Sequence, residues 1–256
     1  MGKIIAIVNQ KGGVGKSTTC VNLGAALRER GKTVLCCDSD PQGNTTSGFG
    51  GDKNKLSPTL YDALIGAAAP GLCIHKTRYV ELMPANKALS GAEIELVALE
   101  GREYRLKDAL AQVRDGYDYI LIDCPPSLGL LTLGALCAAD TVLIPVQCEY
   151  YALEGLSDLM YTVRTVRKSL NPGLEIEGVL LTMFDSRTNL SMQVATEVKR
   201  YFPGKVFGAC VPRNVRLSEA PSHGMPVFYY DRYSRGADSY FDLADEIIKN
   251  NSEGKS

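Results

Sequence analysis

Residues 11–18 read KGGVGKST, and this glycine-rich segment constrains the fold and the chemistry of the chain more than any other. The apolar run Lys3–Asn9 precedes it and predicts a buried strand, and Ser17–Arg30 follows it with a helical pattern. Glycines allow backbone conformations that other residues avoid, and they bring N–H groups close to a bound anion. The start of the following helix adds a partial positive charge. The pattern therefore predicts a loop that binds the phosphates of a nucleoside triphosphate, for which ATP is the expected nucleotide.

Two side chains of the loop have predicted roles of their own. Lys16 is expected to reach the β- and γ-phosphates, and the Ser17 hydroxyl is expected to ligate Mg²⁺. The predicted nucleotide contacts within the loop are Lys11, Gly12, Gly13, Val14, Gly15, Lys16, Ser17 and Thr18. The alternative is a glycine-rich turn that binds nothing, and the flanking strand and helix argue against it.

The loop departs from the common pattern G-x-x-x-x-G-K-[ST] at its first position. Counting back from Gly15, a glycine is expected where the chain has Gln10, and a second lysine, Lys11, precedes the glycine pair. A lysine in a phosphate loop lies close to concentrated negative charge. We therefore expect Lys11 to act on phosphate; a solvated surface charge is the alternative.

Three aspartates follow predicted strands and are candidates for magnesium binding and hydrolysis. Asp123 ends the apolar run YILID, where we expect a carboxylate that holds Mg²⁺ directly or through a water. Asp38 and Asp40 leave the second strand at the edge where open α/β folds bind ligands. We assign Asp40 to orienting the hydrolytic water and Asp38 to supporting the metal. Capping of a turn is the alternative for each, and it is strongest for Asp38.

Apolar runs of strand length alternate with helical patterns along most of the chain. The predicted strands are Lys3–Asn9, Thr33–Asp38, Tyr79–Met83, Tyr117–Cys124, Thr141–Val146, Glu177–Met183 and Lys205–Val211. The predicted helices are Ser17–Arg30, Glu103–Arg114, Leu130–Ala138, Ala152–Leu170, Leu190–Tyr201 and Ser234–Lys249. The alternation predicts an α/β fold with a doubly wound, mostly parallel sheet flanked by helices. We expect one ATPase domain over 1–250, a long loop over 39–57 and a polar C-terminal tail over 251–256.

Composition narrows the partners and the cellular location. The formal net charge of −1 gives no global basic field, so nucleic-acid binding would require a local patch. The N-terminal apolar run is too short for a signal peptide, and no run approaches the ~18 apolar residues that span a bilayer. The expected location is therefore cytoplasmic. The eight cysteines include no C-x-x-C pair, so we expect buried, reduced thiols rather than a metal site or disulfides.

The chain resembles the deviant Walker A ATPases of the ParA/MinD group, and within it the short chromosomal ParA (Soj) branch. The resemblance covers nearly the whole chain. The segments that carry it are KGGVGKSTTCVNLG, CDSDPQGNTTSG, YDYILIDCPPSLGLL, PVQCEYYALEGL, LLTMFDSRTNL and VPRNVRLSEAPSHG. The loop alone indicates only the superfamily, whereas the last three segments are specific to the branch.

The resemblance implies a weak ATPase that forms a homodimer around two ATP molecules with Mg²⁺. In such a dimer Lys11 is the signature lysine, which crosses to the phosphates of the partner subunit and acts in catalysis with Lys16 and Asp40. Gly12 lies where the two loops approach each other, so a side chain there should block pairing. Pro212 and Asn214 match positions near the adenine, which completes the predicted nucleotide contacts.

The resemblance also implies a role in chromosome or plasmid partitioning. The ATP dimer of the family binds double-stranded DNA without sequence preference, and Arg187 and Arg216 match basic positions of that kind. Such binding weakens steeply with salt. The implied partner is a centromere-binding protein of the ParB/Spo0J kind that stimulates hydrolysis, and the implied location is the nucleoid.

Other functions on the same scaffold are less favoured. A MinD-like ATPase that cycles on membranes and positions cell division needs a basic amphipathic C-terminal helix, whereas the end of this chain carries Asp242, Asp245 and Glu246. An iron–sulfur reductase would need cysteines such as Cys124 and Cys148 in glycine-rich surroundings, which are missing. The early position of the loop also leaves no room for an N-terminal helix-turn-helix domain.

Overall fold

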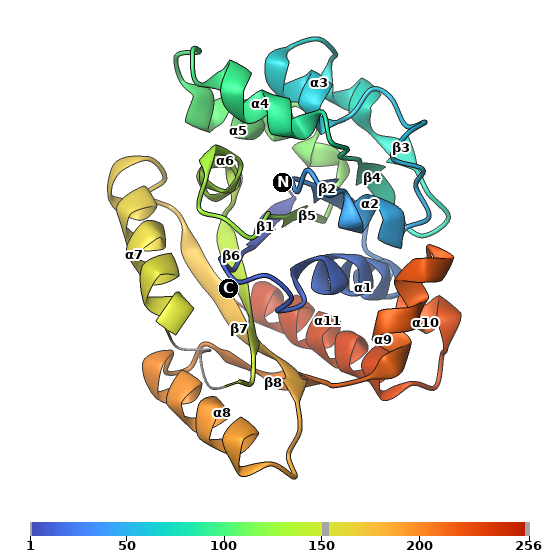
Figure 1. The fold of residues 1–256 in the computed structure, drawn as a ribbon, viewed down its shortest axis with the longest axis vertical. Helices are drawn as coiled ribbons and strands as arrows, with labels where there is room; N and C mark the ends of the chain where they lie inside the picture. The colour runs from blue at the N-terminus through green and yellow to red at the C-terminus, as the bar shows by residue number, and fades with distance from the viewer. Residues whose placement is uncertain (1, 150–153, 254–256) are drawn as a thin grey trace.

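The computed structural model describes residues 2–149 and 154–253, and in this part of the chain eight strands form one sheet (Figure 1). The strand order is β3-β4-β2-β5-β1-β6-β7-β8. The strands are β1 (Lys3–Ile7), β2 (Val34–Asp38), β3 (His75–Lys76), β4 (Glu81–Met83), β5 (Tyr119–Asp123), β6 (Thr141–Gln147), β7 (Glu175–Phe184) and β8 (Val206–Pro212). Neighbouring strands are parallel except for β3 and β4. The carboxyl ends of all strands other than β3 therefore meet at one edge of the sheet.

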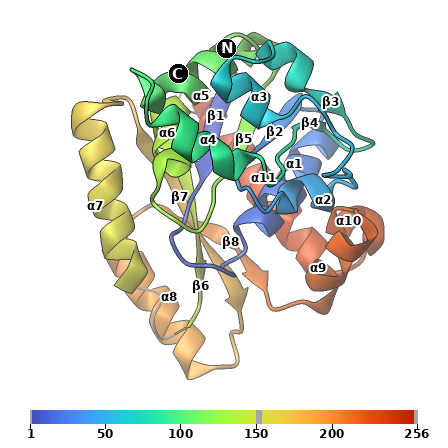
Figure 2. The same ribbon diagram turned by 45° about the horizontal axis from the view of Figure 1, so that its top comes forward.

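Helices cover both faces of this sheet, which confirms the predicted doubly wound fold. The helices are α1 (Lys16–Glu29), α2 (Asn44–Gly48), α3 (Leu60–Ile65), α4 (Leu89–Leu96), α5 (Arg105–Ala111), α6 (Leu130–Ala138), α7 (Glu154–Ser169), α8 (Asn189–Tyr201), α9 (Val215–Glu219), α10 (Val227–Tyr230) and α11 (Arg235–Glu253). In Figures 1 and 2, α1 and α9–α11 gather on one side of the sheet, and α3–α7 gather on the other.

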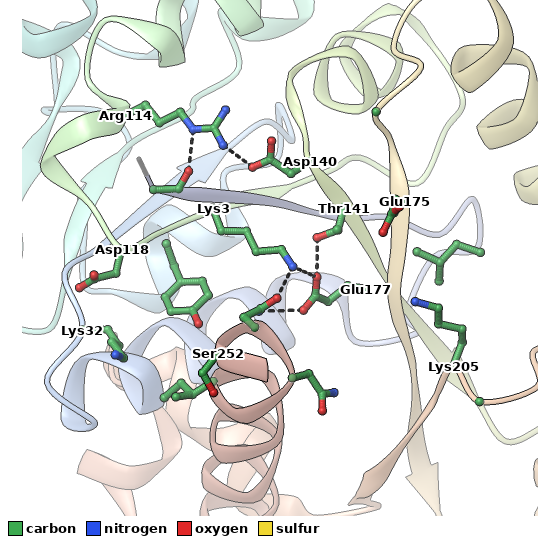
Figure 3. Close-up of a pocket in the computed structure, with 18 residues that line it drawn as sticks. Lys3, Lys32, Arg114, Asp118, Asp140, Thr141, Glu175, Glu177, Lys205 and Ser252 are labelled. Carbon is green, nitrogen blue, oxygen red and sulfur yellow. Dashed lines mark hydrogen bonds and ion pairs between the residues drawn. The ribbon is translucent and has the colours of Figure 1, made fainter. Parts of the chain in front are cut away.

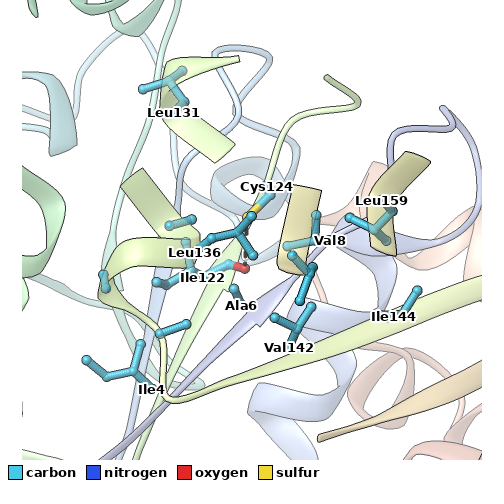
Figure 4. Close-up of a cluster of buried hydrophobic side chains, with 14 of the residues drawn as sticks. Ile4, Ala6, Val8, Ile122, Cys124, Leu131, Leu136, Val142, Ile144 and Leu159 are labelled. Atoms are coloured by element: carbon cyan, nitrogen blue, oxygen red, sulfur yellow. Dashed lines mark hydrogen bonds between the residues drawn. The ribbon is translucent and has the colours of Figure 1, made fainter. Parts of the chain in front are cut away.

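The central strand β1 shows why two layers form. Successive side chains of a strand point to opposite faces. Ile4, Ala6 and Val8 enter a core shared with α3–α8, part of which is shown in Figure 4. Ile5 and Ile7 enter a second core with α1 and α11. Because both faces are buried, the strand is apolar from Ile4 to Ile7, as the sequence predicts.

The predicted loop over 39–57 is partly wrong, because it contains the helix α2. Its five residues are too few for a visible helical period, and it begins after Gly43, whose φ is 62°. The hydroxyl of Thr45 donates to Asp123 across 2.8 Å, and Thr46 donates to Asp38 through both its N–H and its hydroxyl at 2.7 Å. Tertiary hydrogen bonds rather than propensity therefore stabilise this turn of helix.

Other short elements also differ from the prediction. The structure adds α3 and α4 between β2 and β5, and α9 and α10 after β8. The predicted helix Glu103–Arg114 is reduced to α5, with a 3₁₀ turn on each side. Residues 152–153 of the predicted helix Ala152–Leu170 lie outside the described residues, and α7 is observed from Glu154.

The last helix is longer than predicted. Helix α11 continues to Glu253, into the expected polar tail. The Asn251 amide donates to Glu177 Oε1 at 3.0 Å, and Lys3 forms an ion pair of 2.6 Å with Glu177 Oε2 and also donates to Asn251 (Figure 3). These bonds hold the end of the helix against the starts of β1 and β7. Lys3, Glu177 and Asn251 also line a cavity of about 940 Å³ at the edge of the sheet opposite the glycine-rich loop. Residues 254–256 lie outside the described part.

Candidate nucleotide-binding site

The glycine-rich loop joins β1 to α1 at the carboxyl edge of the sheet. Gly13 and Gly15 have φ values of 75° and 93°, a left-handed conformation that glycine adopts without strain. The buried Asn9 side chain fixes the start of the loop: its Oδ1 accepts from the Lys11 N–H at 3.0 Å, and its Nδ2 donates to the Pro145 carbonyl at 2.7 Å. The loop is therefore shaped by its own chain before any ligand binds.

A cavity of about 440 Å³ opens over this loop, within the size range of small-molecule sites. Six of the predicted nucleotide contacts line it: Gly12, Gly13, Gly15, Lys16, Ser17 and Thr18. Asp40 lines it from the segment after β2, Met183 from the end of β7, and Pro221 and Met225 from the segment between α9 and α10. The structure thus brings the loop and one predicted catalytic carboxylate to a single cavity.

Lys16 lines this cavity and is fixed by the loop itself. Its side chain is buried, and Nζ donates to the Lys11 carbonyl at 2.9 Å. Burial lowers the pKa of Lys16, while the charges of Asp123, Cys124 and Asp40 act in the opposite direction. A poorly solvated ammonium beside the loop is suited to binding the charge of a phosphate.

Asp123 is fully buried below the loop, at the end of β5. Its Oδ2 accepts from Thr45, and among the described residues its Oδ1 has no hydrogen-bond partner. Burial, followed by the charge of Asp38, raises the pKa of Asp123 to about 8, although the nearby hydroxyls of Ser17 and Thr45 oppose the rise. A buried carboxylate oxygen without a donor fits a cation, and together with the Ser17 hydroxyl it has the hard oxygen chemistry that Mg²⁺ prefers.

Asp38 and Asp40 have different surroundings although they are two residues apart. The fully buried Asp38 accepts from Thr46 through Oδ2 and from the Asp40 N–H, at 3.2 Å, through Oδ1. Burial raises its pKa to about 6 against these hydrogen bonds. Asp40 instead faces the cavity and accepts from the Gln42 N–H at 2.9 Å. The donors on Asp38 favour the anchoring of α2 over direct contact with a ligand.

The other predicted nucleotide contacts lie outside the lining of the cavity. Lys11 extends beside Gly155 of α7, where a Cβ on that glycine would stand 2.9 Å from the Lys11 Cε. The Val14 carbonyl turns away to accept from Thr182. Asn214 caps α9 by accepting from the Arg216 N–H at 2.8 Å, and Pro212 ends β8. Pro221 and Met225 occupy the lining instead.

The two predicted DNA-binding arginines each pair with carboxylates. Arg187 pairs with Asp185 at 2.8 Å, and this guanidinium lowers the pKa of Asp185 to about 2. Arg216 pairs with Glu219 at 2.8 Å and with Asp231 at 3.1 Å. The elements that follow or carry them, α8 and α9, lie apart in both views (Figures 1 and 2). Within one copy of the chain they do not form one cluster.

Asn9, Thr45 and Thr182 contribute to the site, and the sequence analysis missed them. Each supports the site through one hydrogen bond to the loop or to Asp123. Asparagine and threonine are common, and which of them contacts the loop depends on the register of strands that are distant in sequence. The loop motif itself carries no signal for them.

All eight cysteines are free; seven are buried, as expected, whereas Cys210 is half-buried. Burial strongly raises the pKa of Cys124, and it raises that of Cys148 to about 12. In the described part of the chain, no three His, Cys, Asp or Glu side chains are grouped to hold a metal, and no helix is long and apolar enough to cross a bilayer.

The parallel sheet, the glycine-rich loop before α1 and the buried aspartate on β5 define a P-loop nucleotide-binding protein. Comparison with known proteins agrees, since the AAA_31 family, described as an AAA domain, matches residues 2–176. The chain is 61% identical over 252 residues to the sporulation initiation inhibitor protein Soj of Bacillus subtilis, which covers 98% of this chain and 100% of that protein. It is 54% identical to the chromosome partitioning protein ParA of Myxococcus xanthus, covering 97% of this chain and 89% of the relative.

Solved structures extend the comparison to the whole fold. The cobyrinic acid a,c-diamide synthase of Mycobacterium smegmatis, solved with an ATP analog and magnesium, has a TM-score of 0.88 at 38% identity, over 99% of this chain and 97% of that chain. The cell division ATPase MinD of Pyrococcus furiosus has a TM-score of 0.80 at 30% identity, over 97% and 99%. The chain belongs to the ParA/Soj family of chromosome-partitioning ATPases.

Proposed function

We propose that this protein binds MgATP in the loop cavity and hydrolyses it to switch a DNA-bound dimer during chromosome or plasmid partitioning. The observation that carries the nucleotide part is that the site combines a buried Lys16 ammonium, which lines the cavity of the glycine-rich loop, with a buried Asp123 oxygen that has no donor among the described residues. The solved relative that holds an ATP analog and magnesium supports it. We assign this function to one ATPase domain over residues 1–250.

Each residue of the site has a proposed task. The loop N–H groups and Lys16 bind the phosphates, and Ser17 and Asp123 hold Mg²⁺, with Asp38 behind them. Bound Mg²⁺ supplies charge neutralisation for the leaving phosphates. Asp40, on the cavity wall, orients the attacking water. We assign the adenine contacts to Pro212 and Asn214. Pro221 and Met225 join them in this proposal because both line the cavity.

Two features of the loop support a dimer around ATP. Gly12 is exposed, its φ is not positive, and nothing in the described chain lies within 4 Å of an added Cβ. Its own chain therefore does not require glycine there, whereas close approach of a second copy would. Lys11 lies beside α7 rather than in the lining of its own cavity, as expected for a lysine that serves the nucleotide of a partner subunit.

DNA binding is assigned to Arg187 and Arg216. Their side chains are 87% and 46% exposed. Exposed ion pairs contribute only about 0–1 kcal/mol, so DNA phosphates can replace the carboxylates as partners at small cost. Because the overall charge is −1, a single copy attracts DNA only through these local arginines. A dimer doubles their number, and the proposed binding needs this. The proposed setting is the nucleoid in the cytoplasm, with a ParB/Spo0J-like protein as the stimulating partner.

The membrane-cycling alternative has less support. The apolar face of α11 is used within the fold, where Tyr240, Leu243, Ala244 and Ile247 are buried in the core with α1. An amphipathic membrane helix needs that face exposed to lipid. The end of α11 is in addition hydrogen-bonded to β7 through Asn251 and Glu177.

The test measures binding to a DNA duplex of arbitrary sequence with ATP, with ADP and without nucleotide, over a salt series. We expect binding only with ATP and an affinity that falls linearly on a log–log plot against salt. Arg216→Glu should bind DNA at least about tenfold more weakly and keep its ATP-dependent dimer. Lys168→Glu, an exposed change in the last turn of α7, is the charge-matched control. DNA binding that is independent of nucleotide would contradict the switch.

A further inference from the structure

Thr182 lies next to the phosphate loop but belongs to a strand far from it in sequence. It is near the end of β7, and its side chain is only 2% exposed. Its hydroxyl donates to the Val14 carbonyl at 2.9 Å. Its methyl group lies next to the following residue, since Cγ2 would stand 3.7 Å from a Cβ on Gly15. Thr182 therefore holds the Val14–Gly15 peptide by hydrogen bond and by contact.

The direction of this peptide matters for phosphate binding. The peptide is trans, so its C=O and N–H point in opposite directions. Because Thr182 fixes the Val14 carbonyl on the strand side, the Gly15 N–H must point away from β7. Gly15 lines the loop cavity and is left-handed with a φ of 93°, a conformation from which a glycine peptide reorients easily. A hydrogen bond from outside the loop limits that freedom.

The residue after Thr182 shows that the end of β7 is adapted to the site. Met183 is the non-glycine residue with positive φ in the described chain, at 50°, and it lines the cavity. Consecutive strand residues normally face opposite sides. The left-handed turn at Met183 breaks this alternation, so that Thr182 holds the loop while Met183 faces the cavity. Such a conformation is unfavourable for a residue with a side chain, and it persists where the surroundings require it.

We propose that Thr182 is a positioning residue that orients the Gly15 N–H toward the phosphates of the bound nucleotide. This inference rests on the proposed function of the loop. It adds a role for a residue outside the loop motif and outside the aspartate-bearing strands. It also links the nucleotide cavity to β7, the strand that leads through Asp185 to Arg187.

The test compares three variants of the full chain by calorimetric titration with MgATP. Thr182→Val keeps the branched shape but removes the donor, and we expect ATP to bind about tenfold more weakly. Thr182→Ser keeps the donor and loses the methyl group, and its affinity should stay within about threefold of the unaltered protein. Thr141→Val is the matched control, because that buried strand threonine donates to Glu177 at the opposite edge of the sheet (Figure 3).

The two Thr182 variants separate positioning from packing. If the residue only fills space, valine should bind ATP normally and serine should bind it more weakly, which would overturn the inference. In ¹H–¹⁵N spectra without nucleotide, the Gly15 amide should shift in Thr182→Val and stay in place in Thr141→Val. An unchanged Gly15 amide would also overturn it. Absence of ATP binding by the unaltered protein would overturn the proposed function, and this inference with it.

Discussion

Replacing Asp123 with asparagine should remove a pH dependence from the stability of the nucleotide-free protein. In the unfolded chain this carboxyl titrates near its ordinary pKa of 3.8, whereas in the folded protein burial raises the pKa to about 8. Between these values the folded state binds a proton that the unfolded state has lost. Stability therefore falls as the pH rises through this window and levels off above pH ~8. Asparagine cannot ionise and can still accept the hydrogen bond from Thr45.

The expected loss of stability depends on the pH range over which it is measured. Each pH unit across which one proton is held only by the folded state is worth about 1.4 kcal/mol. Between about pH 6 and pH 8 the loss is about 2 kcal/mol, because titration flattens near the folded pKa. The lower limit is set by Asp38, whose folded pKa of about 6 confines its own contribution to lower pH. A chain of this length should lose about 4 °C or more in melting temperature over the same range.

The assay is thermal unfolding in EDTA, without nucleotide, at three pH values from about 6 to 8. The Asp123→Asn variant should show a clearly flatter dependence than the unaltered protein, and its melting temperature should exceed that of the unaltered protein most at high pH. Identical slopes for the two proteins would refute the reasoning, because they would mean that Asp123 is already ionised in the fold. A steeper slope for the variant would refute it as well.

Three further results are expected. Lys16→Ala should weaken ATP binding about 100-fold or more in a titration, because it removes the buried cation of the cavity; retained tight binding would contradict the phosphate-loop assignment. Asp40→Ala should bind ATP, hydrolyse it about 100-fold more slowly and accumulate as a dimer on DNA; a monomer with ATP, seen by light scattering, would count against the ATP-bound dimer. Gly12→Val should melt within about 1 °C of the unaltered protein yet stay monomeric with ATP, and an ATP-dependent dimer of this variant would remove the argument for close loop approach.

The sequence predicted the parts of the site that lie on regular elements. A glycine-rich run of this pattern between a strand and a helix commonly forms a phosphate-binding loop. The positions of Lys16 and Ser17 therefore followed from the pattern. Asp123 followed from its place at the end of a buried apolar strand. These residues owe their location to local sequence: Lys16 and Ser17 begin α1 and line the cavity, and Asp123 ends β5.

The parts that were missed depend on tertiary contacts. The helix α2 is held by the bonds of Thr45 and Thr46 to two aspartates on different strands. A five-residue helix has no period to detect, and its propensity alone would not sustain it. The positive φ of Met183 likewise has no sequence signal, because methionine is not typical of that conformation.

The two ends of the described chain lie at the same place. Gly2 and Asn251 both line the cavity at the amino edge of the sheet, on the far side from the glycine-rich loop. Termini that lie close together permit circular permutation. A short linker between them, with new ends opened in an exposed turn, should therefore leave the nucleotide cavity intact. A fluorescent label attached at either end would likewise lie away from the face where ATP, a second copy and DNA are proposed to bind.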